Sequence, residues 1–123
     1  AEASVGKRVG NRAVWLGGGP YRYGGSDART GVDCSGFTRY VMSNAAGVQL
    51  SRSSKSQANE GVSISAEQMQ PGDLIFYGGS GGINHVALYI GAGKIVHAST
   101  YSTGIKVSNW NYRTPTKIVN VLG

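Results

Sequence analysis

The chain has 123 residues, of which 40% are hydrophobic, 20 are glycine and one is cysteine. This length suits one domain that buries roughly two-thirds of the surface of its unfolded chain, and the composition excludes a disordered protein. No apolar run approaches the about 18 residues that a membrane-spanning helix needs, and a single cysteine excludes an internal disulfide.

The chain is basic, with twelve Lys and Arg against six Asp and Glu, a net charge of +6. The basic residues are scattered along the sequence, and only Lys7 and Arg8 are adjacent. Nucleic-acid binding proteins usually concentrate such charge, with aromatic residues, on one face or helix. We therefore predict no nucleic-acid partner. A diffuse positive field suits a polyanionic surface, although ordinary solubilising charge explains it equally well.

The N-terminal sixteen residues predict an amphipathic helix. Apolar residues recur at steps of three and four, as one helix face requires: Val5, Val9, Ala13 and Leu16. Glycines 17–19 and Pro20 end the pattern. The glycine-rich segment 17–31 is predicted to be a loop. It lacks the Gly-Lys-Ser/Thr ending of a phosphate-binding loop.

The single cysteine lies where this loop turns into a second helix. Phe37, Tyr40 and Val41 repeat at helical spacing, and Gly47 supplies a C-terminal stop. Asp33 or Cys34 then falls near the N-cap, where unpaired N–H groups favour an anion. We expect this position to lower the thiol pKa below about 8.5. The polar segment 48–57 is predicted to border the site as a loop with a short helix.

The second half of the chain predicts about five short strands. They are separated by turn residues, among them Pro71-Gly72-Asp73 and the glycines between 78 and 82. The predicted strands are 74–77, 85–90, 94–98, 105–108 and 117–122. Helices followed by a meander of strands indicate an α+β domain with an antiparallel sheet.

The two histidines of the chain lie on neighbouring predicted strands. If Gly91-Ala92-Gly93 is a three-residue loop, residues whose numbers sum to 184 pair across the hairpin. His85 and His97 then share one face as diagonal neighbours about 7–8 Å apart. A two-residue loop would place them on opposite faces. We expect the Cys34 helix to lie on the histidine face, with its N-terminus over the imidazoles.

Three interpretations of these residues remain open on the residues alone. A lone cysteine is more often a buried apolar residue than a nucleophile, and a strand histidine is more often structural. One Cys and two His could also hold zinc, but the spacings typical of zinc sites are absent. A cysteine peptidase needs a thiolate, a base and a group that orients the base. These three residues suffice for that.

Five segments, taken in order, resemble the NlpC-type family of bacterial cell-wall cysteine peptidases. They run from residue 20 to about residue 107: Pro20-Tyr21-Arg22-Tyr23-Gly24-Gly25, Asp33-Cys34-Ser35-Gly36-Phe37, Pro71-Gly72-Asp73-Leu74-Ile75-Phe76, His85-Val86-Ala87-Leu88-Tyr89-Ile90-Gly91 and His97-Ala98-Ser99. The resemblance implies a minimal papain-like α+β fold, with N-terminal helices packed on a small antiparallel sheet. It also implies that residues 1–123 form one peptidase domain, which we expect to be part of a longer secreted or envelope-associated protein.

The resemblance assigns roles to six residues. Cys34 would be the nucleophile, His85 the general base and acid, and His97 the residue that orients His85. Tyr21, Asp33 and Ser35 would contact substrate, the last two by receiving the free amine of a peptide stem. The family cleaves stem peptides of peptidoglycan, commonly between D-γ-glutamate and diaminopimelate or lysine, and the implied intermediate is a thioester acyl-enzyme.

Other functions remain open under the same resemblance. The fold could serve a thiol acyltransferase or an amidase, or a wall-binding module whose site is silent. We expect no cofactor and no metal, a monomer, and as partners peptidoglycan stem peptides and the anionic cell-wall surface.

Overall fold

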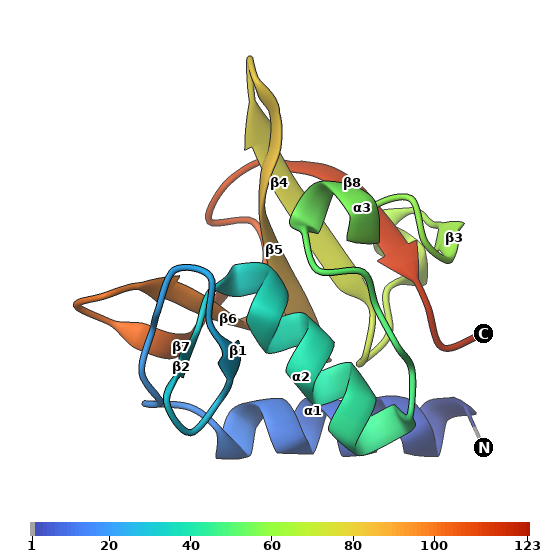
Figure 1. Ribbon diagram of the computed structural model, residues 1–123. Coiled ribbons are helices and arrows are strands. Elements are labelled where there is room, and N and C mark those ends of the chain that lie inside the picture. Colours follow the sequence, from blue (N-terminus) through green and yellow to red (C-terminus); the bar gives the residue numbers. More distant parts are fainter. Residues whose placement is uncertain (1) are drawn as a thin grey trace.

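The computed structural model describes residues 2–123, and the side chains of residues 5–123. Two long helices lie against one side of an antiparallel sheet (Figure 1). Helix α1 spans Glu2–Trp15, as predicted except that residue 1 lies outside the described residues. Val9 and Ala13 are fully buried, so the predicted apolar face is the packed one. In the described chain, no helix is long and apolar enough to cross a membrane.

The loop between α1 and the second helix contains a small hairpin that the sequence did not predict. Strand β1 (Ser26–Asp27) pairs with β2 (Gly31–Val32). Helix α2 then spans Cys34–Ala46 and ends at Gly47 in a left-handed conformation, with φ at 67°. The short helix α3, Ser54–Gln57, follows within the polar segment. The predicted Cys34 helix and the predicted short helix within segment 48–57 are therefore both confirmed.

The main sheet has six strands in the order β3-β8-β4-β5-β6-β7. Five correspond to the predicted strands, while the two-residue β3 and the 3₁₀ helix η1 were not predicted. The spans are β3 Val62–Ser63, η1 Ala66–Gln68, β4 Leu74–Gly79, β5 Gly82–Gly91, β6 Lys94–Thr100, β7 Gly104–Asn109 and β8 Pro115–Asn120. Strands β4 to β7 form the predicted meander. The last strand instead returns to pair with β4 and β3.

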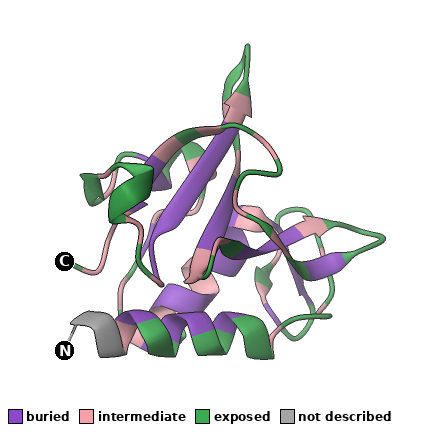
Figure 2. Ribbon diagram, turned by 180° about the vertical axis from the view of Figure 1, so that it is seen from behind, coloured by how far each residue is buried: buried purple, intermediate pink, exposed green. Residues whose placement is uncertain are grey.

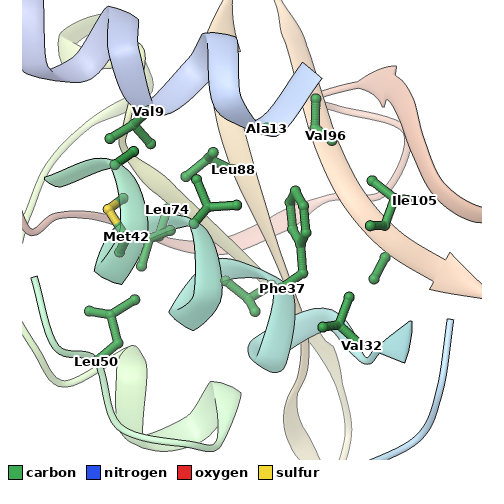
Figure 3. Packing of buried hydrophobic residues seen from close by; sticks show 14 of the residues in the cluster. Val9, Ala13, Val32, Phe37, Met42, Leu50, Leu74, Leu88, Val96 and Ile105 are labelled. Carbon is green, nitrogen blue, oxygen red and sulfur yellow. The ribbon is translucent and has the colours of Figure 1, made fainter. Parts of the chain in front are cut away.

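The main core lies between the two helices and the sheet (Figures 2 and 3). Close packing buries side chains from α1, α2, strand β2, strands β4 to β8 and the connecting loops. Figure 3 labels ten of them, including Val9, Ala13, Phe37, Met42, Leu74, Leu88, Val96 and Ile105. The opposite face of the sheet carries a second, smaller cluster formed by Ile75, Tyr77, Ala87, Ile95 and Ile118. The domain is thus α+β with a core on each side of its sheet.

The two cores correct one prediction. The helices cover the face of β5 that carries Val86 and Leu88, whereas His85 alternates with Val86 and belongs to the other face, with Ala87. The expectation that the Cys34 helix lies on the histidine face is therefore wrong. The physical reason is that Val86 and Leu88 form the more apolar set, and burying apolar area against the helices dominates the choice of face.

The hairpin that carries the histidines has the predicted register, but its turn is shorter than predicted and a bulge makes up the difference. The turn has two residues, Ala92 and Gly93, both with positive φ (54° and 75°), as a type I′ turn requires. The pairing shifts by one residue between Tyr89 and Gly91. This bulge restores the pairs Leu88↔Val96 and Tyr89↔Ile95, whose numbers sum to 184. The histidines therefore share a face despite the two-residue turn.

Candidate active site

Cys34 is the first residue of α2, and Asp33 caps that helix. The Asp33 carboxylate accepts hydrogen bonds from the backbone N–H of Gly36 at 2.9 Å and of Gly24 at 3.0 Å. A Cβ atom at Gly36 would collide with the carbonyl of Gly25, so only glycine lets the glycine-rich loop lie against the helix start. The N-cap bond and this close approach hold the half-buried thiol in place.

The thiol meets strand β5 at its backbone. The backbone N–H groups of Val86, Ser35 and Cys34 itself act on the Cys34 sulfur and lower its pKa. Pairing between β5 and β6 runs from Leu88↔Val96 to Gly91↔Lys94, so Val86 lies beyond the paired stretch. The helix reaches the strand from the Val86 face, so the thiol meets the backbone of the residue that follows His85 in the chain.

The pKa of the Cys34 thiol is shifted in the direction opposite to the prediction. Burial raises the pKa of Cys34 above its ordinary value, and the negative charge of Asp33 adds to the rise. The three backbone N–H groups lower the pKa but do not outweigh burial. The prediction of a lowered thiol pKa is therefore wrong: at neutral pH the resting site holds a protonated thiol.

The two histidines are in direct contact. His85 Nε2 lies 2.7 Å from His97 Nδ1, and the ring centroids are 5.0 Å apart. Burial, followed by the positive charge of Arg113, lowers the pKa of His85 to about 4. Burial, with His85 and Lys106, lowers the pKa of His97 to about 3. Both rings are therefore neutral at pH 7, and one of the two donates the proton in the bond between them.

Three residues that the sequence did not single out surround the histidine pair. Ser108 Oγ, on β7, lies 2.9 Å from His97 Nε2. The Tyr112 ring packs against His97 with centroids 5.2 Å apart. Arg113 donates to Asn84 Oδ1 at 3.1 Å and lies over the Tyr77 ring. The connection between β7 and β8 thus covers the histidines.

Arg52 joins the substrate-facing residues predicted around Cys34. Its guanidinium donates to Ser35 Oγ at 2.9 Å and to the Gly25 carbonyl at 3.0 Å, and forms an ion pair with Asp33 at 3.0 Å. The fork of guanidinium donors suits several oxygen acceptors at once. Asp33 and Ser35 are therefore already bonded to Arg52 in the free protein, and the Asp33 carboxylate is neutralised.

A cleft of about 400 Å³ opens over the thiol. The residues that line it are Tyr23, Gly24, Asp33, Cys34, Ser35, Arg52, Ser53, Ser54 and Asn84. The predicted segment 48–57 thus borders the site. Tyr21 lies beside it, packed edge-on against Tyr101 with ring centroids 4.8 Å apart. Burial, then Cys34 and Asp33, raise the pKa of Tyr21, so its phenol keeps its proton and can donate.

The described residues contain no group of three or more His, Cys, Asp or Glu side chains placed to hold a metal ion. The contact between the histidines already occupies one nitrogen of each ring. The three residues suit acid–base and nucleophilic chemistry: a thiol at a helix start that lines an open cleft, and a pair of imidazoles in contact on the strands next to it.

Replacing Asp33 by alanine should lower stability by about 1–2 kcal/mol, because the helix loses its N-cap and Arg52 loses its partner. Chemical denaturation measures this change. Asp27→Ala is the matched control, because solvent screens the exposed Asp27–Arg29 pair, and its loss should lower stability much less. Equal losses in the two variants would contradict the structural role of Asp33.

The residues missed by sequence reasoning carried weak signals. Ser108 pairs with Ile95 and therefore lies diagonal to His97 on the same face, which a correct β6–β7 register would have indicated. Arg52 lies within a serine-rich run that the sequence marked only as polar. For Tyr112 and Arg113, we find no pattern in the sequence that distinguishes them from other loop residues.

Comparisons with known proteins identify the family of the chain. The family model described as "NlpC/P60 family" matches residues 18–121. The chain is 44% identical over 94 residues to the Escherichia coli (strain K12) protein named "Probable endopeptidase NlpC", covering 75% of this chain and 60% of that protein. It is 39% identical over 106 residues to the Bacillus subtilis (strain 168) "Gamma-DL-glutamyl hydrolase", covering 86% of this chain and 25% of that protein.

Solved structures are similar over almost the whole chain. The crystal structure of the NlpC/p60 domain of the peptidoglycan hydrolase SagA matches with a TM-score of 0.84 and 36% identity, covering 94% of this chain and 97% of that one. The peptidoglycan hydrolase RipB of Mycobacterium tuberculosis matches with a TM-score of 0.86 and 31% identity, covering 99% and 67%. The chain spans less than two thirds of the length of the curated relatives named above. On the family model, the sequence relatives and these structures together, the chain belongs to the NlpC/P60 family.

Proposed function

We propose that this chain is a peptidoglycan hydrolase, a cysteine endopeptidase that cleaves the bond between D-γ-glutamate and the diamino acid of cell-wall stem peptides. The observation that carries the proposal is the 2.7 Å contact between His85 and His97, together with a thiol at the start of α2 that meets the backbone of Val86, the residue after His85. Relatives named as an endopeptidase and as a γ-glutamyl hydrolase support the reaction class. Solved relatives described as peptidoglycan hydrolases support the substrate.

The first half of the reaction forms a thioester. His85 Nε2 is occupied by His97, so Nδ1 is the nitrogen available to take the thiol proton. The Cys34 sulfur then attacks the γ-glutamyl carbonyl, and the backbone N–H of Cys34 and the Tyr21 phenol donate to the developing oxyanion. His85 returns the proton to the departing amine as the carbon–nitrogen bond breaks. The diamino acid fragment leaves, and the glutamyl group stays on sulfur.

The second half of the reaction releases the glutamyl product. Water gives a proton to His85 and adds to the thioester carbonyl, and the carbon–sulfur bond breaks. The proton on His85 passes to the sulfur, which restores the neutral thiol. Since both groups are neutral at rest, charge separates only when the proton moves to His85, and the buried His97 partner stabilises the imidazolium.

Substrate binding is assigned to the cleft and to the surface charge. Tyr21, Asp33 and Ser35 would contact the bound stem, and a stem amine would share the Asp33 carboxylate with Arg52. The net charge of +6 favours association with the anionic cell wall. This substrate places the protein outside the cytoplasmic membrane, either secreted or bound to the envelope. We further propose that residues 1–123 form one monomeric peptidase domain within a longer chain.

Digestion of purified sacculi of known stem composition tests the function. Mass spectrometry should identify fragments that end in D-glutamate with a free γ-carboxyl, together with fragments that begin at the diamino acid. An amidase would instead release whole stems from the glycan, and an acyltransferase would give products only with an added amine acceptor. A silent wall-binding module would bind sacculi without releasing fragments. Each of these three outcomes would overturn the proposal.

Activity should persist at an acidity that would protonate an ordinary histidine. His85 must be neutral to accept the thiol proton, and its pKa is lowered to about 4 from an ordinary value of about 6.5. We therefore expect kcat/KM to hold its plateau down to about pH 5 and to fall near pH 4. Arg113→Gln removes a charge that lowers this pKa, so its acid limb should move to higher pH.

The measurement needs a control for unfolding. Both histidines have folded pKa values below their unfolded values, so the unfolded chain binds more protons and stability falls as pH drops from about 6.5 towards 4. Circular dichroism at each pH identifies this loss. An acid limb near pH 6.5 in a fully folded enzyme would contradict the lowered pKa of His85.

A further inference from the structure

The hydrogen bonds at the site continue beyond the histidine pair, from His97 to Ser108. His97 is 1% exposed, and its two ring nitrogens have different partners. Nδ1 faces His85 Nε2 at 2.7 Å, and Nε2 faces Ser108 Oγ at 2.9 Å. A buried neutral imidazole has one donor and one acceptor nitrogen, so the partner of either nitrogen affects which tautomer is populated.

The reaction requires one particular order of protons along this chain. For His85 to accept the thiol proton at Nδ1, its own proton must be on Nε2, from which it donates to His97. His97 Nδ1 must then be the acceptor, and the His97 proton must be on Nε2. That proton needs an acceptor, and the Ser108 hydroxyl oxygen is the group within hydrogen-bond distance.

We infer that Ser108 is a positioning residue of this enzyme: its hydroxyl accepts the Nε2 proton of His97 and thereby favours the tautomers in which His85 can act as a base towards Cys34. The inference rests on the proposed function for its catalytic consequence. The tautomer of His97 itself does not depend on that function, because it is a property of the free protein.

The fold places Ser108 for this role. Ser108 pairs with Ile95 across β6 and β7, and His97 pairs with Lys106, so Ser108 and His97 are diagonal neighbours on one face. Tyr112 packs on the other side of the His97 ring and limits its rotation. The ring is thus held between an aromatic contact and two hydrogen bonds, one along each nitrogen.

Loss of the hydroxyl should redistribute the tautomers. In Ser108→Ala the His97 Nε2 proton has no protein acceptor, and the alternative tautomer can instead donate from Nδ1 to His85. That tautomer places the His85 proton on Nδ1, so Nδ1 can no longer accept the thiol proton and the base is disabled. We expect kcat/KM to fall about five- to ten-fold, the range of one ordinary hydrogen bond. Ser108→Thr keeps the hydroxyl, suits a strand, and should recover most of the lost rate.

The test combines kinetics with nitrogen NMR of the histidine rings. In the wild-type protein, long-range proton–nitrogen correlations should show His97 protonated at Nε2 and unprotonated at Nδ1. Ser108→Ala should shift His97 towards the Nδ1-protonated form, and Ser108→Thr should restore the wild-type spectrum. Ser63→Ala, on the exposed strand β3, is the matched control for removing a strand serine and should change neither rate nor spectrum.

The possible outcomes separate this inference from the proposed function. A wild-type His97 protonated at Nδ1, or a tautomer unchanged in Ser108→Ala, would overturn the role of Ser108 whatever the enzyme does. A rate equal to wild type in a folded Ser108→Ala would overturn it as well. If the tautomer shifts as expected while no variant hydrolyses sacculi, the proposed function fails and the role of Ser108 in ordering the ring protons stands.

Discussion

Replacing Cys34 by alanine or serine is expected to abolish hydrolysis of muropeptides while the fold survives. The nucleophile forms the covalent intermediate, so its loss should lower kcat by at least about a thousandfold. Serine is included because its hydroxyl is far less acidic than the thiol, and the lowered pKa of His85 makes that ring a weak base for it. The rate of fragment release from sacculi, followed by mass spectrometry, measures the effect.

The structural cost of these substitutions should be small. Cys34 is half-buried, and its sulfur contributes no disulfide, so the thermal midpoint should change by only a few degrees. Trapping of the acyl-enzyme by acid quench adds a second readout: an adduct should form on the wild-type chain and on neither variant. Full activity in either variant would show that the nucleophile is misassigned.

The second large effect is expected at His97, where the identity of the replacement matters. Alanine at position 97 leaves the Nε2 proton of His85 without the acceptor that lies 2.7 Å away in the wild-type protein. The His85 ring is then free to rotate or to adopt the tautomer that is protonated at Nδ1. We expect a fall in kcat/KM of about a hundredfold or more, on the scale seen when the orienting group of a triad is lost. Asparagine offers an amide oxygen at a similar position and should retain more activity than alanine.

Two controls make the comparison specific. His97 is almost fully buried, so denaturation curves of both variants are needed to separate lost activity from lost fold. Lys94→Ala changes an exposed residue at the start of the same strand, β6, and should leave the rate within about twofold, as is usual for surface substitutions. Equal rates for the alanine and asparagine variants would argue against an orienting role.

The elements of this protein could be predicted because their signals are local. Apolar residues at helical spacing predicted α1. Helix α2 was predicted from the residues at its own two ends: Asp33 caps its start and Gly47 ends it, as the structure confirms. The histidine pair was also within reach, since residues two apart on one strand share a face and the hairpin register placed both on the same side. The bulge between Tyr89 and Gly91 compensated for a turn one residue shorter than expected.

The order of residues was enough to predict the chemical groups and the elements that carry them: one thiol at a helix start and two imidazoles on one hairpin. Three features depend on the folded chain: the face of β5 that the helices cover, the burial that raises the thiol pKa, and the positions of Arg52, Ser108 and Tyr112 around the site. The physical reason is the range of the interactions. Capping, turns and side-chain periodicity depend on neighbours in the chain, whereas desolvation and contacts between distant strands exist only after the core has closed.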